Sequence, residues 1–239
     1  MSSILKPSTN IKVRRSNERG HANLGWLNSY FTFSFADYYN PQHMGYRTLR
    51  VLNDDTIDAG QGFGMHPHKD MEIVSYLIEG DLQHKDNMGH GAIIKEGNLQ
   101  RITAGTGILH SEFNPSSQKK THLLQIWILP EQKGLKPSYQ ELNLRDLKKS
   151  LTLIASNQEK EGIIQIHQDV QLYRGYFTPG KKGEYELKKE RGIWIQMIKG
   201  QIEINGIKLQ QGDGASVENE NIIHIQADRE SEFLMFDLK

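Results

Sequence analysis

Two pairs of residues in the sequence have the types and spacing of metal ligands. His66 and His68 flank Pro67, and His110 and Glu112 form a second pair with the same spacing. Residues i and i+2 of a β-strand point to the same face, so each pair can direct two ligand atoms toward one point. Two such strands facing one interior would surround an ion with three imidazoles and one carboxylate. The sequence therefore predicts a metal site at these four residues.

A second carboxylate competes with Glu112 in this prediction. Glu72 lies four residues after His68, so a regular strand would place both side chains on one face. Glu72 therefore stays open as the alternative ligand. His84 and His90 lie beside charged or flexible residues, and we interpret them as solvated turn histidines rather than as ligands.

The donor set limits the choice of metal. The chain has no cysteine, which excludes thiolate ligands and disulfide bonds. Three imidazoles and one carboxylate suit a divalent first-row metal, and an octahedral ion would keep two positions for substrate or oxygen. This set is close to the histidine and carboxylate sites of non-haem Fe(II) oxygenases. We therefore expect one divalent ion, with Fe(II) as the first choice and Mn, Ni, Co, Cu or Zn as alternatives.

The composition argues against several classes of partner. The chain has 239 residues, and its 29 basic and 29 acidic residues give a formal net charge of zero. Without a basic stripe, no direct nucleic-acid partner is expected. Residues 1–7 lack the apolar core of a signal peptide, and no apolar run is long enough to span a membrane. These features predict a cytoplasmic protein without a membrane partner.

The elements that must position the ligands are expected to be β-strands. The sequence combines 22 glycines and 7 prolines with many short β-branched runs, a pattern typical of an all-β chain. Strands are predicted at residues 11–13, 46–53, 73–78, 121–129, 151–155, 162–167, 170–177, 183–187 and 193–198.

Other segments suggest more specific roles. Phenylalanine alternates with small polar residues over 31–35, which we interpret as a strand with an aromatic face in the core. Residues 92–95 and 97–102 are predicted to form a hairpin, and residues 131–150 a linker with at most a short helical turn. The glycine-rich bend 103–107 precedes a strand rather than a helix, so a phosphate-binding loop is rejected.

The second half of the sequence repeats the pattern of the first. Leu77–Leu82 resembles Met197–Ile202, and Glu96–Asn98 resembles Gln211–Asp213. The chain is therefore expected to contain two copies of one β-barrel unit. The first copy would be a metal-binding domain over residues 1–135 and the second a degenerate domain over 150–239.

The second copy lacks the predicted ligands. When the copies are aligned on the glycine that ends the repeated segment, Glu186 and Lys188 stand where the first copy has His66 and His68. His224 is then left alone, and a single imidazole holds a metal poorly. The second domain is therefore expected to be structural and without metal.

These motifs resemble those of the cupin superfamily. The first cupin motif begins at Gly60 and runs through His66, His68 and Glu72, and the second ends at His110 and Asn114. More narrowly, the chain resembles the pirin family, in its bacterial two-domain form that includes quercetin 2,3-dioxygenase-like proteins. This resemblance is dense from about residue 10 to 130 and diffuse beyond, and it rests on the segments Gly20–Ala22, Trp26–Ser29, Phe33–Tyr39, His66–His68 and Thr103–Glu112.

The resemblance implies a fold and an activity. The fold would be a bicupin, with two β-barrels or jelly rolls packed as an internal pseudo-dimer, and the protein would be a monomer. The metal ligands would be His66, His68, His110 and Glu112. The activity would be a metal-dependent dioxygenase of the quercetinase type, which cleaves the ring of a flavonol with O2 and releases CO. Glu112 would also be catalytic, as the base that takes the 3-hydroxyl proton.

A second function class stays open beside the enzyme. Pirin-like proteins also resemble regulatory partners of other proteins, so the chain is alternatively a metal- or redox-sensing binding module. An enzyme needs an open metal face and an apolar pocket. A sensor needs an exposed surface that depends on the metal.

Overall fold

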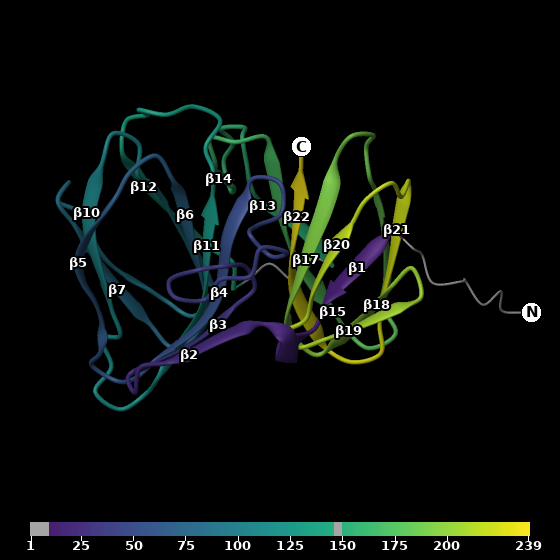
Figure 1. The fold of residues 1–239 in the computed structure, drawn as a ribbon, viewed down its shortest axis with the longest axis horizontal. Coiled ribbons are helices and arrows are strands. Elements are labelled where there is room, and N and C mark those ends of the chain that lie inside the picture. Colours follow the sequence, from purple (N-terminus) through teal and green to yellow (C-terminus); the bar gives the residue numbers. More distant parts are fainter. Residues whose placement is uncertain (1–9, 146–149) are drawn as a thin grey trace, which may run out of the picture. The chain divides into compact units, whose positions relative to one another are not determined.

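The structure, a computed structural model, describes residues 10–145 and 150–239, which form two compact units. We call residues 19–145 and 157–168 the N-terminal domain. Residues 10–18, 150–156 and 169–239 form the C-terminal domain. Among the described residues, the one helical segment is the 3-10 turn η1 (Ser16–Glu18), and Figure 1 shows strands throughout the rest. No helix in these residues is long and apolar enough to cross a membrane.

The N-terminal domain contains a large and a small antiparallel sheet (Figure 1). The large sheet has the strand order β12-β9-β6-β11-β4-β3-β2, and the small sheet has the order β5-β10-β7-β8. The large-sheet strands are β2 (Gly20–Asn23), β3 (Leu27–Phe31), β4 (Leu49–Ile57), β6 (Glu72–Glu79), β9 (Asn98–Thr103), β11 (Thr121–Ile128) and β12 (Ser138–Asn143). Those of the small sheet are β5 (Gly62–His68), β7 (Leu82–Asp86), β8 (Gly91–Ile94) and β10 (Ile108–Phe113). A two-residue strand, β14 (Ile164–Gln165), lies in the same domain.

The N-terminal core is built from apolar residues of both sheets. Large-sheet residues such as Leu77 and Leu123 pack with small-sheet residues such as Leu82 and Ile94, and all four are fully or almost fully buried. Apolar contacts of this kind are the main favourable term in folding. They hold the small sheet, which carries the predicted ligands, against the large one.

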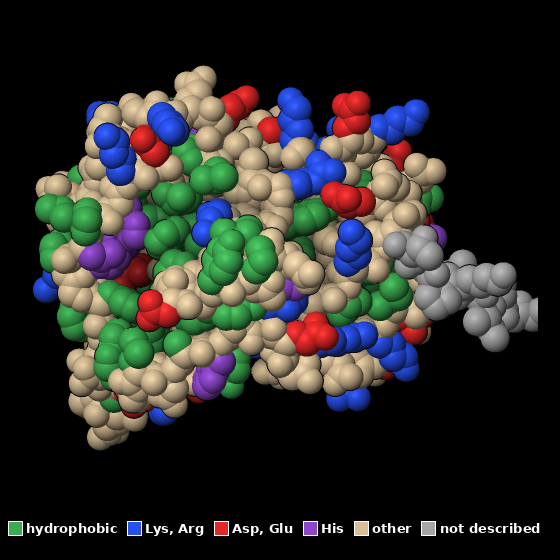
Figure 2. Space-filling view, viewed as in Figure 1, with side chains coloured by type: hydrophobic (Ala, Val, Ile, Leu, Met, Phe, Trp, Pro, Cys, Tyr) green, Lys and Arg blue, Asp and Glu red, His purple; other side chains and the backbone are tan. Residues whose placement is uncertain are grey.

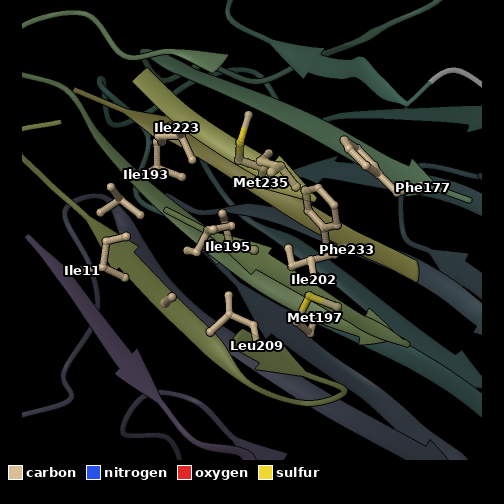
Figure 3. Close-up of a cluster of buried hydrophobic side chains, with 14 of the residues drawn as sticks. Ile11, Phe177, Ile193, Ile195, Met197, Ile202, Leu209, Ile223, Phe233 and Met235 are labelled. Carbon is tan, nitrogen blue, oxygen red and sulfur yellow. The ribbon is translucent and has the colours of Figure 1, made fainter. Parts of the chain in front are cut away.

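The C-terminal domain repeats this plan. Its larger sheet contains, in order, β1-β20-β17-β22-β15-β13, and its smaller sheet has the order β16-β21-β18-β19. Figure 3 shows Ile, Met and Phe side chains from both sheets converging on one apolar core. Its strands are β1 (Ile11–Arg14), β13 (Leu151–Ser156), β15 (Val170–Phe177), β16 (Lys182–Glu186), β17 (Gly192–Lys199), β18 (Gln201–Ile204), β19 (Ile207–Gln210), β20 (Gly214–Val217), β21 (Ile222–Ala227) and β22 (Ser231–Leu238).

Three local predictions were wrong. Residues 92–95 and 97–102 form no hairpin, because β8 pairs with β7 while β9 pairs with β6 and β12 in the other sheet. Residues 131–150 are more than a linker, because β12 lies within them and pairs with β9 along its whole length. Its side chains are half-buried or exposed, so the sequence of this strand has no apolar pattern. The strand is held by its backbone pairing with β9. The expected strand over 31–35 also fails, because β3 ends at Phe31.

Candidate metal centre

The three predicted imidazoles meet on the small sheet of the N-terminal domain. In the pairing of β5 with β10, His66 lies opposite His110, and His68 lies opposite Ile108. The ring centroids are 4.8 Å apart for His66 and His68, 4.5 Å for His66 and His110, and 4.9 Å for His68 and His110. One nitrogen from each ring lies within 4.8 Å of the other two. This geometry allows three imidazoles to bind one ion.

Glu112 is buried and lies two residues along β10 from His110. Its Oε1 accepts hydrogen bonds from Gln100 Nε2 at 2.7 Å and Ser75 Oγ at 3.3 Å, and its Oε2 accepts one from Gln125 Nε2 at 2.8 Å. The carboxylate forms a second candidate group with His110 and His84, whose ligand atoms also lie within 4.8 Å of one another. Three donors therefore hold Glu112 in a defined orientation next to the imidazoles.

Glu72, the alternative ligand, belongs to a different network. Its Oε2 accepts a hydrogen bond from Thr103 Oγ1 at 3.2 Å, and its Oε1 lies 3.3 Å from His167 Nδ1. Arg101 is 4.0 Å away. Burial raises the pKa of Glu72, although Arg101 and His167 oppose the rise. Glu72 does not share a strand face with His68, because the chain turns through Asp70, at φ +49°, and continues in the other sheet.

The imidazoles of His68 and His110 are held in the form that binds metals. Burial, together with a smaller effect of the neighbouring imidazoles, lowers the pKa of His68 to about 4 and that of His110 to about 3. Both rings are therefore neutral at pH 7, and a metal ligand must offer a free lone pair.

His110 supplies the observation that tests whether a metal fits. Its side chain is fully buried, and within the described part of the chain neither Nδ1 nor Nε2 has a hydrogen-bond partner. Buried polar atoms are almost always paired, so an orphaned buried imidazole indicates a missing ligand. A divalent ion beside His66, His68 and Glu112 would satisfy one of these nitrogens.

A cavity of about 590 Å³ opens beside these residues. His66, His68 and Glu112 form part of its wall, and most of the remainder is aromatic or aliphatic. Figure 2 shows histidine and hydrophobic side chains gathered on this face, over the region of β5 and β10. The lining also contains Ser29, Phe31, Phe35, Tyr38, Asn53, Asp55, Phe63, Gln125 and Trp127.

The aromatic segment over 31–35 serves both the core and this cavity. Phe31 and Phe33 are buried, as predicted, and Phe31 and Phe35 also line the cavity. Phe35 packs edge-on against Trp127 at 5.4 Å, and Trp127 packs edge-on against the imidazole of His68 at 5.0 Å. The phenylalanines therefore connect the metal centre to an aromatic wall, which their alternation alone did not reveal.

Comparison with known proteins places these features in one family. The profile described as Pirin matches residues 12–128, and that of the quercetinase C-terminal cupin domain matches residues 153–238. The chain is 48% identical over 228 residues to quercetin 2,3-dioxygenase of Escherichia coli K12, which covers 95% of this chain and 98% of the relative. The chain belongs to the pirin family. The predicted family and the two-domain cupin fold are thereby confirmed.

Solved pirin structures share the whole fold. The crystal structure of YhhW from E. coli is 48% identical, with a TM-score of 0.93 over 96% of this chain and 97% of that one. A second structure, of the bacterial pirin YhhW in complex with nickel(II), has a TM-score of 0.92 at 47% identity and covers 95% of this chain and 98% of that one. The relatives therefore include one pirin that binds a divalent metal.

The C-terminal domain of this pirin corrects the predicted alignment. Glu184 lies opposite His224 and Glu186 opposite Ile222, as His66 lies opposite His110 and His68 opposite Ile108. Glu184 and Glu186, not Glu186 and Lys188, therefore stand at the two histidine positions. The shift arises because residues 187–191 separate β16 from β17, whereas only residues 69–71 separate β5 from β6.

Two residues of the pirin site were missed in the sequence. His84 is not a solvated turn residue, because it is fully buried on β7 opposite Glu112. His84 and Asp86 have the same i, i+2 spacing as the two predicted ligand pairs, and that signal was available. Asp55 lies on β4 in the cavity wall and accepts a hydrogen bond from Ser29 Oγ.

Asp55 has an unusual acidity for a carboxyl group. Burial raises its pKa to about 7 against the opposing Ser29 hydrogen bond, and the negative charges of Asp54 and Glu112 add to the rise. The protonated form of this carboxyl group is therefore accessible near neutral pH. No sequence pattern indicated this, because the shift depends on burial by distant strands.

Proposed function

We propose that this pirin is a metal-dependent dioxygenase of the quercetinase type, which cleaves the central ring of a flavonol with O2 and releases CO. The observation that carries the proposal is a cluster of three imidazoles, two half-buried and one fully buried, that opens onto an aromatic cavity of about 590 Å³. A pocket of this kind, apolar with a few convergent polar groups, is typical of a small-molecule site. The name of the E. coli relative supports the same substrate class.

The metal would be held by His66, His68, His110 and Glu112. This set combines the close imidazole group with the carboxylate that neighbours His110 on β10. Fe(II) stays the predicted ion, and the nickel(II) complex of the E. coli relative makes nickel a second choice. When bound, the metal would act as a Lewis acid that favours ionisation of the substrate hydroxyl and orients it.

The protein's own residues would orient the substrate and move one proton. The Phe35 and Trp127 rings would pack against the flavonol rings and exclude water from the reacting bond. Glu112, held by Gln100 and Gln125, would accept the 3-hydroxyl proton. Asp55, when protonated, would donate a hydrogen bond to a substrate oxygen in the same cavity.

The proposal is tested by following quercetin absorbance and oxygen uptake with protein loaded in turn with iron, nickel, manganese, cobalt and copper. We expect turnover and CO release with at least one ion. The Glu112→Gln variant keeps the size of the side chain but removes its charge and its use as a base. It should therefore lower kcat by about 10²–10⁴-fold, the usual contribution of general base catalysis, and lower metal content much less.

Two outcomes would change this assignment. Equal losses of turnover and metal in the Glu112→Gln variant would make Glu112 a ligand without a role as base. Absence of turnover with every ion, in protein that has bound the metal, would reject quercetin as substrate. It would also favour the metal-sensing module as the function of this pirin.

A further inference from the structure

A second histidine and aspartate pair lies behind the metal centre, on β7. His84 and Asp86 both have fully buried side chains, and His84 Nε2 lies 3.1 Å from Asp86 Oδ2. A carboxylate only accepts hydrogen bonds. Nε2 of His84 therefore carries the ring proton, and Nδ1 presents a lone pair.

Asp86 is held firmly enough to set this tautomer. Its Oδ1 accepts hydrogen bonds from the backbone N–H groups of Met88 at 2.9 Å and His90 at 3.0 Å, and its Oδ2 accepts one from His90 Nδ1 at 3.0 Å. Burial raises the pKa of Asp86, but the hydrogen bonds from His84, His90 and Met88 outweigh it and leave the pKa lowered. Asp86 is thus an ionised carboxylate although its side chain is buried.

The His84 ring lies next to the His110 ring. In the pairing of β7 with β10, His84 is opposite Glu112 and Asp86 is opposite His110. The His84 and His110 ring centroids are 5.5 Å apart, and Tyr139 stacks on His84 at 4.9 Å. Within the described residues, His84 Nδ1 has no hydrogen-bond partner.

His110 needs such a neighbour once a metal is bound. Its two orphaned nitrogens cannot both bind one ion, so the second must carry a proton that requires an acceptor. Metal-binding histidines almost always donate this N–H to a carboxylate, a carbonyl or a water. β5, with His66 and His68, borders β10 on one side, and β7, with His84 and Asp86, borders it on the other.

We propose that His84 and Asp86 are a positioning pair for the metal ligand His110: His84 Nδ1 accepts the ring N–H of His110, and Asp86 fixes the tautomer of His84. The proposal rests on the metal site proposed above. The pair would orient the His110 ring and strengthen it as a donor to the metal. The His84 ring would stay off the metal, acting through His110 alone.

Nickel affinity of the full chain, measured by competition with a chelator, tests this pair. His84→Phe keeps a flat ring against Tyr139 but removes the acceptor, and Asp86→Asn removes the charge that sets the tautomer. Each should weaken nickel binding by roughly 10–100-fold, as loss of such outer partners does in other metalloproteins. His84→Gln restores an acceptor oxygen and should recover part of the loss. The matched control His224→Ala removes an exposed imidazole that lies 3.1 Å from the Glu184 carboxylate in the C-terminal domain, and it should leave the affinity unchanged.

A spectroscopic readout separates positioning from simple structural damage. In the cobalt(II)-loaded protein, ring N–H protons of the ligating histidines give strongly shifted NMR signals that vanish on exchange with D2O. The His110 signal should exchange slowly in the native sequence and in His224→Ala, and quickly in His84→Phe. Circular dichroism identifies any variant that fails to fold, and Asp86→Asn then provides the second test.

Three results would overturn the proposal. Unchanged nickel affinity and exchange in His84→Phe and Asp86→Asn would show that the pair does not act on His110. A change in the cobalt absorption spectrum that indicates one ligand fewer in His84→Phe would make His84 a ligand itself. Failure of the native sequence to bind any metal would remove the metal site and this pair together, before any variant is compared.

Discussion

Buried carboxyl groups of the N-terminal domain differ in role because they differ in hydrogen-bond partners. Glu112 accepts from two amides and a hydroxyl, and Asp86 accepts from two imidazoles and two backbone amides. Glu72 has Arg101 and His167 as cationic or titratable neighbours, and burial still raises its pKa. Residue type alone therefore does not decide whether a carboxyl group could bind the metal, orient a histidine or donate a proton.

Asp55→Asn should stabilise the metal-free protein above pH 7. Because the folded-state pKa of about 7 lies above the ordinary value of 3.8, the unfolded chain loses this proton first as pH rises. The free energy of unfolding therefore falls between about pH 4 and pH 7 by up to roughly 4 kcal/mol. Asparagine stays neutral and keeps an acceptor for Ser29, so the variant escapes this loss.

Urea unfolding of both proteins at pH 4, 5.5 and 8 measures the effect. The variant and the native sequence should be equally stable near pH 4 and should diverge by pH 8. A constant difference at all three pH values would contradict the raised pKa of Asp55.

At the scale of elements, the bend before β10 sets where this strand begins, and so where its residues His110 and Glu112 lie. Gly105 has a φ of +46°, and a Cβ at this position would lie 1.9 Å from the carbonyl oxygen of Leu135. The bend is also fixed by the hydrogen bond from Thr106 N to Leu135 O at 2.8 Å. The segment 131–137, expected to be a linker, thus packs directly on the turn that leads into the metal-site strand.

Gly105→Ala should destabilise the protein by about 2–4 kcal/mol. The methyl group meets a backbone atom that cannot rotate away, and alanine adds strain at a positive φ. Gly91→Ala is the control, because a Cβ there meets nothing within 4 Å and its φ lies outside the left-handed region. Denaturant midpoints report both changes, and equal midpoints for the two variants would contradict the role of the bend.

At the scale of the molecule, two cupin domains share one strand plan but differ in their small sheets. The register that brings His66 opposite His110 brings Glu184 opposite His224 in the C-terminal domain. His224 Nδ1 lies 3.1 Å from Glu184 Oε1, and both side chains are largely exposed. An imidazole and a carboxylate that are both exposed to water interact weakly and do not form a buried ligand set. The expected monomer and cytoplasmic location stay predictions.

Elemental analysis should find one metal ion per chain. His66→Ala should lose most of it, because the remaining ligands leave one side of the ion open to water and to chelators. His224→Ala should keep the metal content of the native sequence. Two ions per chain, or a loss of metal in His224→Ala, would contradict the assignment of the site to the N-terminal domain alone.

The sequence by itself determined the all-β class, the duplicated cupin pattern and three imidazoles on alternate strand positions. These features follow from local covalent geometry, because side chains two residues apart share a strand face wherever the strand lies. The spacing of His66, His68, His110 and Glu112 needed no knowledge of the fold. The cupin motifs, with their glycines at fixed positions, could likewise be identified from the sequence alone.

Only the tertiary structure decided what surrounds the imidazoles. His84 and Asp86 lie beside the imidazoles because β7 pairs with β10. Glu72 lies in a different network because β6 belongs to the other sheet. The raised pKa of Asp55 also depends on strands distant in sequence. Strand partners, register and burial are set by non-local packing, and no spacing of residues along the chain encodes them directly.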